Sequence, residues 1–148
     1  MEDDRQKSIV YVYTGFTQNS YGEVLMVLRN EEILPNAHGK LGLPGGVMEW
    51  GETPQDTVVR EIFEETGYSV QIVSKESVAI TCQWEYPDKI QQHTVIHCYP
   101  CKILSGSPQI TNDEGVLEVR FLSIDQLTQE NCLPGIYDLV HYFVSKKQ

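Results

Sequence analysis

The chain of 148 residues has the length of one ordinary domain and can bury a sizeable core without disulfides. Its composition, 41% hydrophobic and 22% charged, is typical of a folded globular protein. The formal net charge of −10 argues against a basic nucleic-acid-binding surface, although bound divalent cations would reverse the local sign and admit phosphate ligands. We therefore expect one domain over residues 1–148, with no duplex nucleic acid as its partner.

The predicted elements begin with two strands. β-Branched and aromatic residues predict strands at 8–16 and 22–29, with a polar turn around Asn19 and Gly22 between them. Residues 33–46 contain too many glycines and prolines for a regular element, so we expect an irregular loop there.

A helix is predicted after this loop, because both of its ends are marked. Thr53 can cap the helix, Pro54 suits its first position, and Gly67 suits a left-handed residue just past its end. At about 100° per residue, the apolar side chains of one arc are Val58, Val59, Ile62 and Phe63, and the carboxylates of the opposite arc are Glu61, Glu64 and Glu65. We expect the helix to bury the first arc and expose the second, so a change of Glu65 to Gln should spare the fold.

Strand patterns and a closing helix account for the rest of the chain. Residues 69–86 and 89–104 flank Pro87 and predict a long antiparallel pair. Residues 116–122 predict a further strand, and residues 135–147 an amphipathic helix. Helices mixed with a largely sequential sheet indicate an α/β layered domain.

The cellular compartment and the cysteines are predicted together. No segment has the apolar length of a membrane span, and the charged start MEDDRQKS has no apolar signal core behind it, so we expect a cytoplasmic protein without a membrane partner. Cys82, Cys98, Cys101 and Cys132 are then expected to stay reduced. Cys98 and Cys101 form a C-x-x-C pair, but residues three apart on a strand point to opposite faces, and no second close pair completes a zinc site. We interpret the cysteines as buried structural thiols.

The acidic segment GGVMEWGETPQDTVVREIFEETGY, residues 45–68, is either a solvated helix face or a metal site. Three carboxylates on one arc fit a hard metal, because Mg²⁺ is held by a few carboxylates together with water and substrate phosphates. Glu52 precedes the helix, and Arg60 within it can orient a neighbouring carboxylate or simply stabilise its acidic neighbours. Gly45 and Gly46 allow close backbone approach, and this combination favours a site.

The same segment resembles the Nudix box, written G-x5-E-x7-R-E-U-x-E-E-x-G-U, where U is a bulky aliphatic residue. Every fixed position matches, namely Gly46, Glu52, Arg60, Glu61, Glu64, Glu65 and Gly67. The preceding GKLGLPGG, residues 39–46, also resembles the approach to the box in nucleotide-processing members. Two positions depart from the pattern: Tyr68 replaces the last aliphatic residue, and Leu41 stands where many relatives have Trp.

The resemblance implies a Nudix-type α/β/α sandwich with a mixed β-sheet. It also implies Mg²⁺-dependent hydrolysis, with Mn²⁺ as a substitute, of the pyrophosphate linkage in a nucleoside diphosphate derivative. Such a derivative is a nucleoside triphosphate, a dinucleoside polyphosphate or a nucleotide sugar, and oxidised nucleotides and ADP-ribose remain open.

Site residues follow from the same resemblance. Glu64 and Glu65 would be the main metal ligands, and Glu61 a further ligand or the base that activates water. The Gly45 carbonyl would complete the coordination.

Three further residues near the metal have implied roles. Glu52 would support the site, and Arg60 would orient its carboxylates. Glu114 resembles an extra acidic ligand supplied by a loop before a late strand, with Asp113 and Glu118 as competing candidates.

Three residues outside the motif are candidates for substrate binding. Arg29 ends the second predicted strand and can reach a substrate phosphate, although an arginine there is often simply exposed. Trp84 and Tyr86 can stack on a base, since every base has a π-face, or can be ordinary strand aromatics. Some related dinucleoside polyphosphate hydrolases have a Tyr at about the distance of Tyr86 from the box.

The expected partner is thus a small-molecule nucleotide, and the sequence leaves a homodimer open. Two other functions stay open as well. A Nudix-type domain can sense a nucleotide without hydrolysing it, which a turnover assay would reveal. An acidic helix face can also be only solvated, in which case a metal titration would show no binding.

Overall fold

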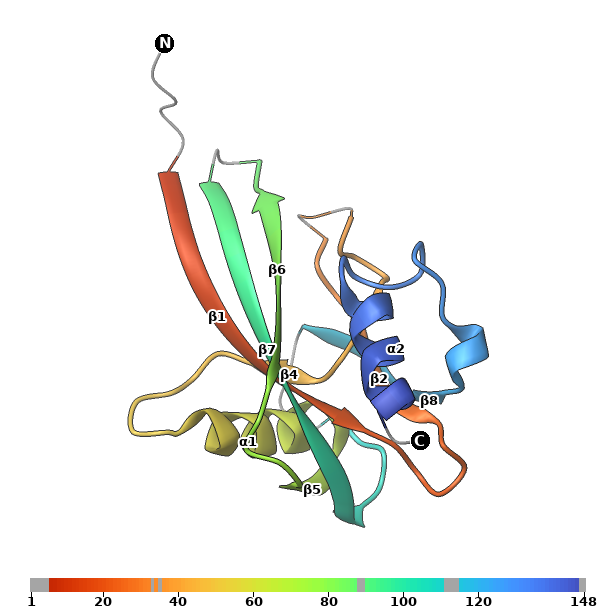
Figure 1. Ribbon diagram of the computed structural model, residues 1–148. Helices are drawn as coiled ribbons and strands as arrows, with labels where there is room; N and C mark the ends of the chain where they lie inside the picture. The colour runs from red at the N-terminus through yellow and green to blue at the C-terminus, as the bar shows by residue number, and fades with distance from the viewer. Residues whose placement is uncertain (1–5, 33, 35, 88–89, 111–114, 147–148) are drawn as a thin grey trace.

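The computed structural model describes residues 6–32, 34, 36–87, 90–110 and 115–146 (Figure 1). One sheet contains β1 (Gln6–Thr17), β4 (Gly45–Gly46), β5 (Tyr68–Ile72), β6 (Val78–Glu85) and β7 (Ile90–Gly106). A second sheet contains β2 (Val24–Arg29), β3 (Leu41–Gly42) and β8 (Val116–Leu122). The helices are α1 (Pro54–Thr66), α2 (Ile136–Lys146) and the short 3₁₀ helix η1 (Ile124–Gln126).

The larger sheet is mixed. Its strand order is β4-β1-β7-β5, with β6 also paired to β7. β1 and β7 run parallel over their whole common length, whereas β4, β5 and β6 pair antiparallel with their neighbours. Because β1 and β7 are parallel, the chain must cross over between them, and α1 lies in that crossover.

The strands lie between two helices, each with its own hydrophobic cluster. On β2, Val24 and Met26 pack in a cluster with α2, whereas Leu25 between them packs in a cluster with α1. Alternate residues of a strand point to opposite faces, so both faces of β2 are covered. The arrangement in Figure 1 is therefore an α/β/α sandwich with a mixed sheet, and the fold prediction is confirmed.

The C-x-x-C pair follows the strand geometry predicted for it. Cys98 packs in the cluster of α2 and Cys101 in the cluster of α1, on opposite faces of β7. Burial raises the pKa of both thiols to about 12. Cys132 is also buried, whereas Cys82 is only half-buried. These cysteines are free thiols.

The prediction of one long strand at 69–86 is wrong. The segment forms two strands, β5 and β6, separated by residues 73–77. β5 pairs with the last residues of β7, whereas β6 pairs with its first half. A single partner strand that is 17 residues long accommodates both, which explains why their combined sequence resembles one continuous strand.

The predicted ends of α1 are confirmed. The hydroxyl of Thr53 accepts a hydrogen bond from the backbone N–H of Asp56 at 3.1 Å, and the Asp56 carboxylate accepts one from the N–H of Thr53. Gly67 ends the helix in the left-handed conformation with φ of 84°. This reciprocal cap satisfies two N–H groups that the helix leaves unbonded.

The predicted faces of α1 are right for Val58 and Ile62, which are buried, and wrong for Val59, Phe63 and Glu65. Val59 and Phe63 are 36% and 47% exposed, whereas Glu65 is fully buried beside Val58 and Ile62. Residues seven apart on a helix differ by only about 20° in direction, so Glu65 shares the stripe of Val58. Gly15 of β1 makes room for this stripe, because a Cβ there would lie 2.5 Å from the Cδ1 of Ile62. Within the described residues, no helix is long and apolar enough to cross a membrane.

Candidate active site

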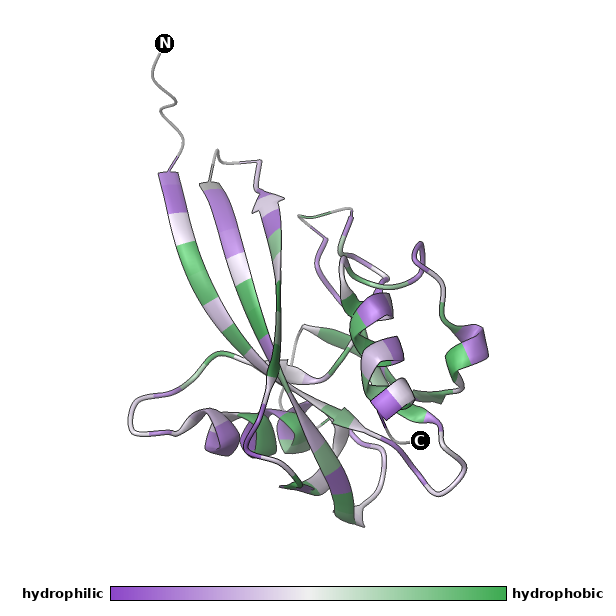
Figure 2. Ribbon diagram, in the orientation of Figure 1, coloured by the Kyte–Doolittle hydropathy of each residue, from purple (hydrophilic) through white to green (hydrophobic). Residues whose placement is uncertain are grey.

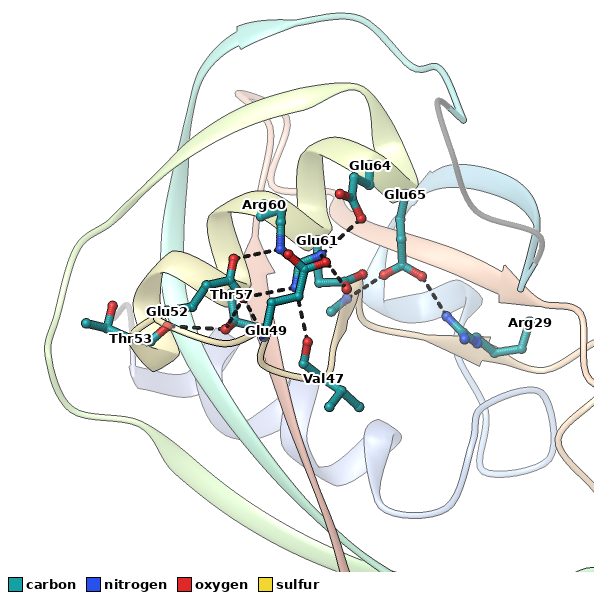
Figure 3. A network of polar contacts seen from close by, with 11 residues as sticks. Arg29, Val47, Glu49, Glu52, Thr53, Thr57, Arg60, Glu61, Glu64 and Glu65 are labelled. Atoms are coloured by element: carbon teal, nitrogen blue, oxygen red, sulfur yellow. Dashed lines mark hydrogen bonds and ion pairs between the residues drawn. The ribbon is translucent and has the colours of Figure 1, made fainter.

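Arg60, in the middle of the crossover helix α1, is the centre of a network of carboxylates (Figure 3). Its Nε donates to Glu52 at 2.7 Å, and one terminal nitrogen donates to Glu61 at 2.9 Å and to Glu64 at 3.1 Å. The other terminal nitrogen donates to Glu52 and to the backbone carbonyl of Val47. One guanidinium therefore orients three motif carboxylates, which come from the helix and from the loop before it.

Glu52 is fixed by more than this ion pair. Its Oε1 also accepts hydrogen bonds from the Thr57 hydroxyl at 3.0 Å and from the backbone N–H of Glu49 at 2.8 Å. The Arg60 guanidinium, followed by the Glu49 N–H, lowers the pKa of Glu52 from 4.5 to about 2. The Glu52 carboxylate in turn raises the pKa of Arg60, so both groups stay charged at neutral pH.

Glu65 forms an ion pair with a second arginine, Arg29. Its Oε2 accepts a hydrogen bond from Arg29 at 2.8 Å, and its Oε1 accepts one from the backbone N–H of Gly45 at 2.6 Å. The Arg29 side chain is 29% exposed and the Glu65 side chain only 1% exposed. The predicted phosphate-binding residue and a predicted metal ligand are thus paired with each other.

The two glycines of β4 bring backbone against this network. A Cβ on Gly46 would lie 2.4–2.7 Å from the carboxyl atoms of Glu61, and one on Gly45 would lie 2.2 Å from the backbone oxygen of Tyr13. β4 pairs with β1 at Tyr13 and Thr14, which holds both glycines against the helix. A side chain at Gly45 would meet fixed backbone, whereas one at Gly46 would have to displace the Glu61 carboxylate.

The motif acids suit a hard divalent cation in their donor chemistry, since carboxylate oxygens are the protein ligands that Mg²⁺ prefers. Because Gly46 has no Cβ, the Glu61 carboxylate can lie directly against the β4 backbone. Within the described ranges, no three His, Cys, Asp or Glu side chains already form a metal-binding group. The carboxylates face Arg60 and Arg29 instead. Binding a cation would therefore exchange arginine contacts for metal contacts.

A cleft of about 420 Å³ adjoins the network and gathers the predicted substrate residues. Arg29, Gly45, Trp84 and Tyr86 all line it. One wall is the face of β1, β6 and β7 that carries the even-numbered residues from Val10 to Thr14, Cys82 to Tyr86 and Gln92 to Ile96. A larger hollow of about 820 Å³ at the free ends of these strands touches Trp84 but no motif residue. The smaller cleft is therefore the one beside the carboxylates.

The late acidic candidates are placed only in part. Glu114 and Asp113 lie outside the described residues. Glu118 lies on β8 and forms an exposed ion pair with Arg120 at 2.7 Å.

Several residues of the site and the cleft were missed at the sequence level. Glu49 lies 3.6 Å from Arg60, and Thr57 holds Glu52. Cys82, Gln92 and Thr94 line the cleft. The sequence pattern that could have identified these three cleft residues is the alternation of side chains along β6 and β7. It places every second residue on the face of Trp84 once the pairing of the two strands is known.

Comparison with known proteins agrees with this architecture. A model of the NUDIX domain family matches residues 6–143. A putative nudix hydrolase 1 from Caenorhabditis elegans is 28% identical over 120 residues, which cover 81% of this chain and 30% of that protein. An 8-oxo-dGTP diphosphatase from Escherichia coli (strain K12) is 35% identical over 80 residues, which cover 53% of this chain and 57% of that protein. The matched regions thus span less than two thirds of these relatives.

A solved structure extends the comparison over nearly the whole fold. A NUDIX hydrolase from Nitrosomonas europaea superposes with a TM-score of 0.69 at 19% identity, covering 95% of this chain and 92% of that one. At this identity the likeness concerns the fold alone. The family match, in contrast, includes every fixed position of the box and runs through both sheets and both long helices. The chain therefore belongs to the NUDIX domain family.

Proposed function

We propose that the protein is a Mg²⁺-dependent hydrolase that cleaves the pyrophosphate linkage of a nucleoside diphosphate derivative. The observation that carries the proposal is the juxtaposition of two parts. The carboxylates that Arg60 orients lie beside a cleft. Arg29 and the aromatic side chains of Trp84 and Tyr86 line this cleft. Pyrophosphate needs positive charge, and a base needs an apolar surface for stacking.

Glu61, Glu64 and Glu65, together with the carbonyl of Gly45, would hold the cation, and Mn²⁺ would substitute for Mg²⁺. Glu114 is a further candidate ligand in this proposal. A bound divalent ion neutralises pyrophosphate charge and lowers the pKa of water. Because this chain has a net charge of −10, an anionic substrate would otherwise be repelled.

Hydrolysis joins a water oxygen to one phosphorus, breaks the bridging P–O bond and leaves one water proton to be accepted by the protein. Glu52 is a poor acceptor, because Arg60 lowers its pKa to about 2. We assign it the role of holding Arg60, which orients Glu61 and Glu64. Glu61, against the Gly46 backbone, is the carboxylate that we propose as the proton acceptor or as a further metal ligand.

The substrate would lie along the cleft. Arg29 would leave Glu65 to contact a phosphate, and Trp84 and Tyr86 would contact the base. The name of the Escherichia coli relative, an 8-oxo-dGTP diphosphatase, supports a nucleoside triphosphate as one candidate. Dinucleoside polyphosphates and nucleotide sugars offer the same two chemical groups.

The test is a screen of these three nucleotide classes with Mg²⁺ or Mn²⁺, in which phosphate, pyrophosphate and nucleoside monophosphate are quantified. We expect hydrolysis of at least one class, its loss after EDTA treatment and its return when the metal is restored. An undiminished rate in EDTA would refute the metal dependence. Nucleotide binding without turnover would instead support a non-catalytic sensing domain.

A further inference from the structure

The wall of the cleft formed by β1, β6 and β7 changes from apolar to polar along its length. Its middle is apolar, with Val12 and Ile96. Beyond them lie Thr94, Gln92 and Trp84, and Figure 2 shows that β7 becomes hydrophilic toward this end. Small-molecule clefts are mostly apolar, and their few polar groups fix the orientation of a ligand. The polar end of this wall is therefore the part that can recognise a ligand through hydrogen bonds.

Gln92 is held in one orientation. Its Nε2 donates to the Thr94 hydroxyl at 3.1 Å. Thr94 and Trp84 in turn hydrogen-bond to the thiol of Cys82 and thereby oppose the burial that raises its pKa. Because the Thr94 oxygen accepts from the Gln92 Nε2, this contact fixes the Gln92 amide group. The Gln92 Oε1 is then the acceptor that remains for a ligand.

This acceptor lies beside an aromatic surface and away from the carboxylates. Trp84 is the direct cross-strand neighbour of Gln92. Gln92 is level with Ser8 on β1, six residues before Thr14, which pairs with Gly45. Its amide reaches back to Thr94, which is level with Val10, four residues before Thr14. Six strand residues span about 20 Å and four span about 13 Å. A nucleotide whose phosphates lie near Gly45 would extend its sugar along the apolar middle and bring its base to Trp84 and Gln92.

We propose that Gln92, positioned by Thr94, is a specificity-determining residue that accepts a hydrogen bond from the exocyclic amino group of a nucleobase. The cleft would then prefer an amino-bearing base over the base with a keto oxygen at the same ring position. A keto oxygen cannot donate to Gln92 Oε1, so this contact would be lost in the complex. This inference rests on the proposed function, since it assumes that the cleft binds a nucleotide.

The experiment measures the Kd of matched nucleoside diphosphates by calorimetry, with Ca²⁺ as the cation. The pairs are ADP with IDP and CDP with UDP, in which a keto oxygen replaces the amino group, and GDP with IDP, in which a hydrogen replaces it. We expect the tightest ligand to carry an amino group and to bind about tenfold more tightly than its partner without that group, the factor that one hydrogen bond supplies. If the wild-type protein shows no such preference, the inference is overturned, and no variant needs to be measured.

Variants then assign the preference to Gln92. Gln92→Leu should reduce the ratio to about one, and Thr94→Val should reduce it in part, because the amide loses its anchor. The matched control is Gln91→Leu on the opposite face of β7, where the Gln91 amide donates to Glu85 at 3.1 Å. The control should keep the wild-type ratio. A ratio that survives in Gln92→Leu would overturn the assignment.

The outcome is separable from that of the proposed function. Hydrolysis of nucleotides without a base preference would overturn this inference and leave the proposed function standing. Base-selective binding without hydrolysis would overturn the proposed function and support the reading role of Gln92.

Discussion

Glu65 has both carboxylate oxygens in hydrogen bonds and no exposed surface. One oxygen accepts from the Arg29 guanidinium and the other from the backbone N–H of Gly45. A glutamine of the same size would turn an NH₂ group toward one of these donors. The side chain lies in the buried stripe of α1, so the structure leads us to expect that Glu65→Gln destabilises the fold, in contrast to the expectation from the sequence.

We predict that Glu65→Gln lowers the free energy of unfolding by about 1.5–3 kcal/mol, the range for a lost hydrogen bond to a charged group. Urea denaturation measures this change. The control is Glu64→Gln, whose side chain is 30% exposed and should change stability by less than about 1 kcal/mol. Equal stabilities of the two variants would contradict the buried ion pair with Arg29.

The Glu52 carboxylate should make folding stability dependent on pH in an acidic window. Its pKa of about 2 lies below the usual 4.5, so its charge stabilises the folded state fully above pH 4.5 and progressively less as the pH falls toward 2. The difference in urea midpoint between wild type and Glu52→Gln should thus be constant from about pH 7 to 5 and shrink from about pH 4.5 to 2.5. Glu49→Gln is the control, because Glu49 lies 3.6 Å from Arg60 and is largely exposed. A difference that does not shrink in acid would count against the pairing of Glu52 with Arg60.

At the residue scale, the sequence identified the participants but not all of their partners. The spacing of the box predicts that Arg60 lies near Glu64, because these residues are four positions apart on a helix. The contact of Arg60 with the adjacent Glu61 does not follow from helical spacing. The pair of Arg29 and Glu65 joins residues 36 positions apart, which no local pattern encodes. It depends on the packing of α1 near the end of β2.

At the scale of elements, β4 and α1 meet through two glycines with different neighbours. A Cβ on Gly45 would meet fixed backbone of β1, whereas a Cβ on Gly46 would meet the movable end of Glu61. We predict that Gly45→Ala destabilises the fold by about 1–3 kcal/mol, as overpacking does. Gly46→Ala should keep more stability and lose at least about tenfold in kcat, because it displaces a carboxylate of the site.

Thermal unfolding and nucleotide hydrolysis together separate the two glycine variants. We expect Gly45→Ala to have the lower melting temperature of the two variants and Gly46→Ala to have the lower kcat. If Gly46→Ala were fully active, the contact between Glu61 and β4 would have no role in catalysis.

The sequence predicted the ends of α1 but only half of its buried face, namely Val58 and Ile62, and the two results have different causes. Thr53, Pro54 and Gly67 act through their own backbone, so their signals are local. The buried face depends on which side meets β1, where Gly15 admits Val58 and Ile62. Phe63 is therefore exposed despite its apolar character.

At the scale of the whole molecule, an α/β layered fold was predictable because helices are mixed with the strands along the chain, and the α/β/α sandwich followed from the resemblance to the Nudix box. The split of residues 69–86 into β5 and β6 was not, since both strands pair with the same long β7. The cleft was also not predictable from the order of the elements or from the strand patterns. It forms where β1, β6 and β7 face residues of β2 and the segments near α2.

The central claim is that the carboxylates around Arg60 form the catalytic site of a pyrophosphohydrolase. The most direct measurement compares kcat with Mg²⁺ for wild type and Glu64→Gln on the best nucleotide of the screen, with circular dichroism to verify equal folding. We predict hydrolysis by the wild type and a loss of about 10²–10³ in kcat for the variant, the range for one well-placed electrostatic group. Equal rates from two folded proteins, or no hydrolysis of any nucleotide by the wild type, would contradict the claim.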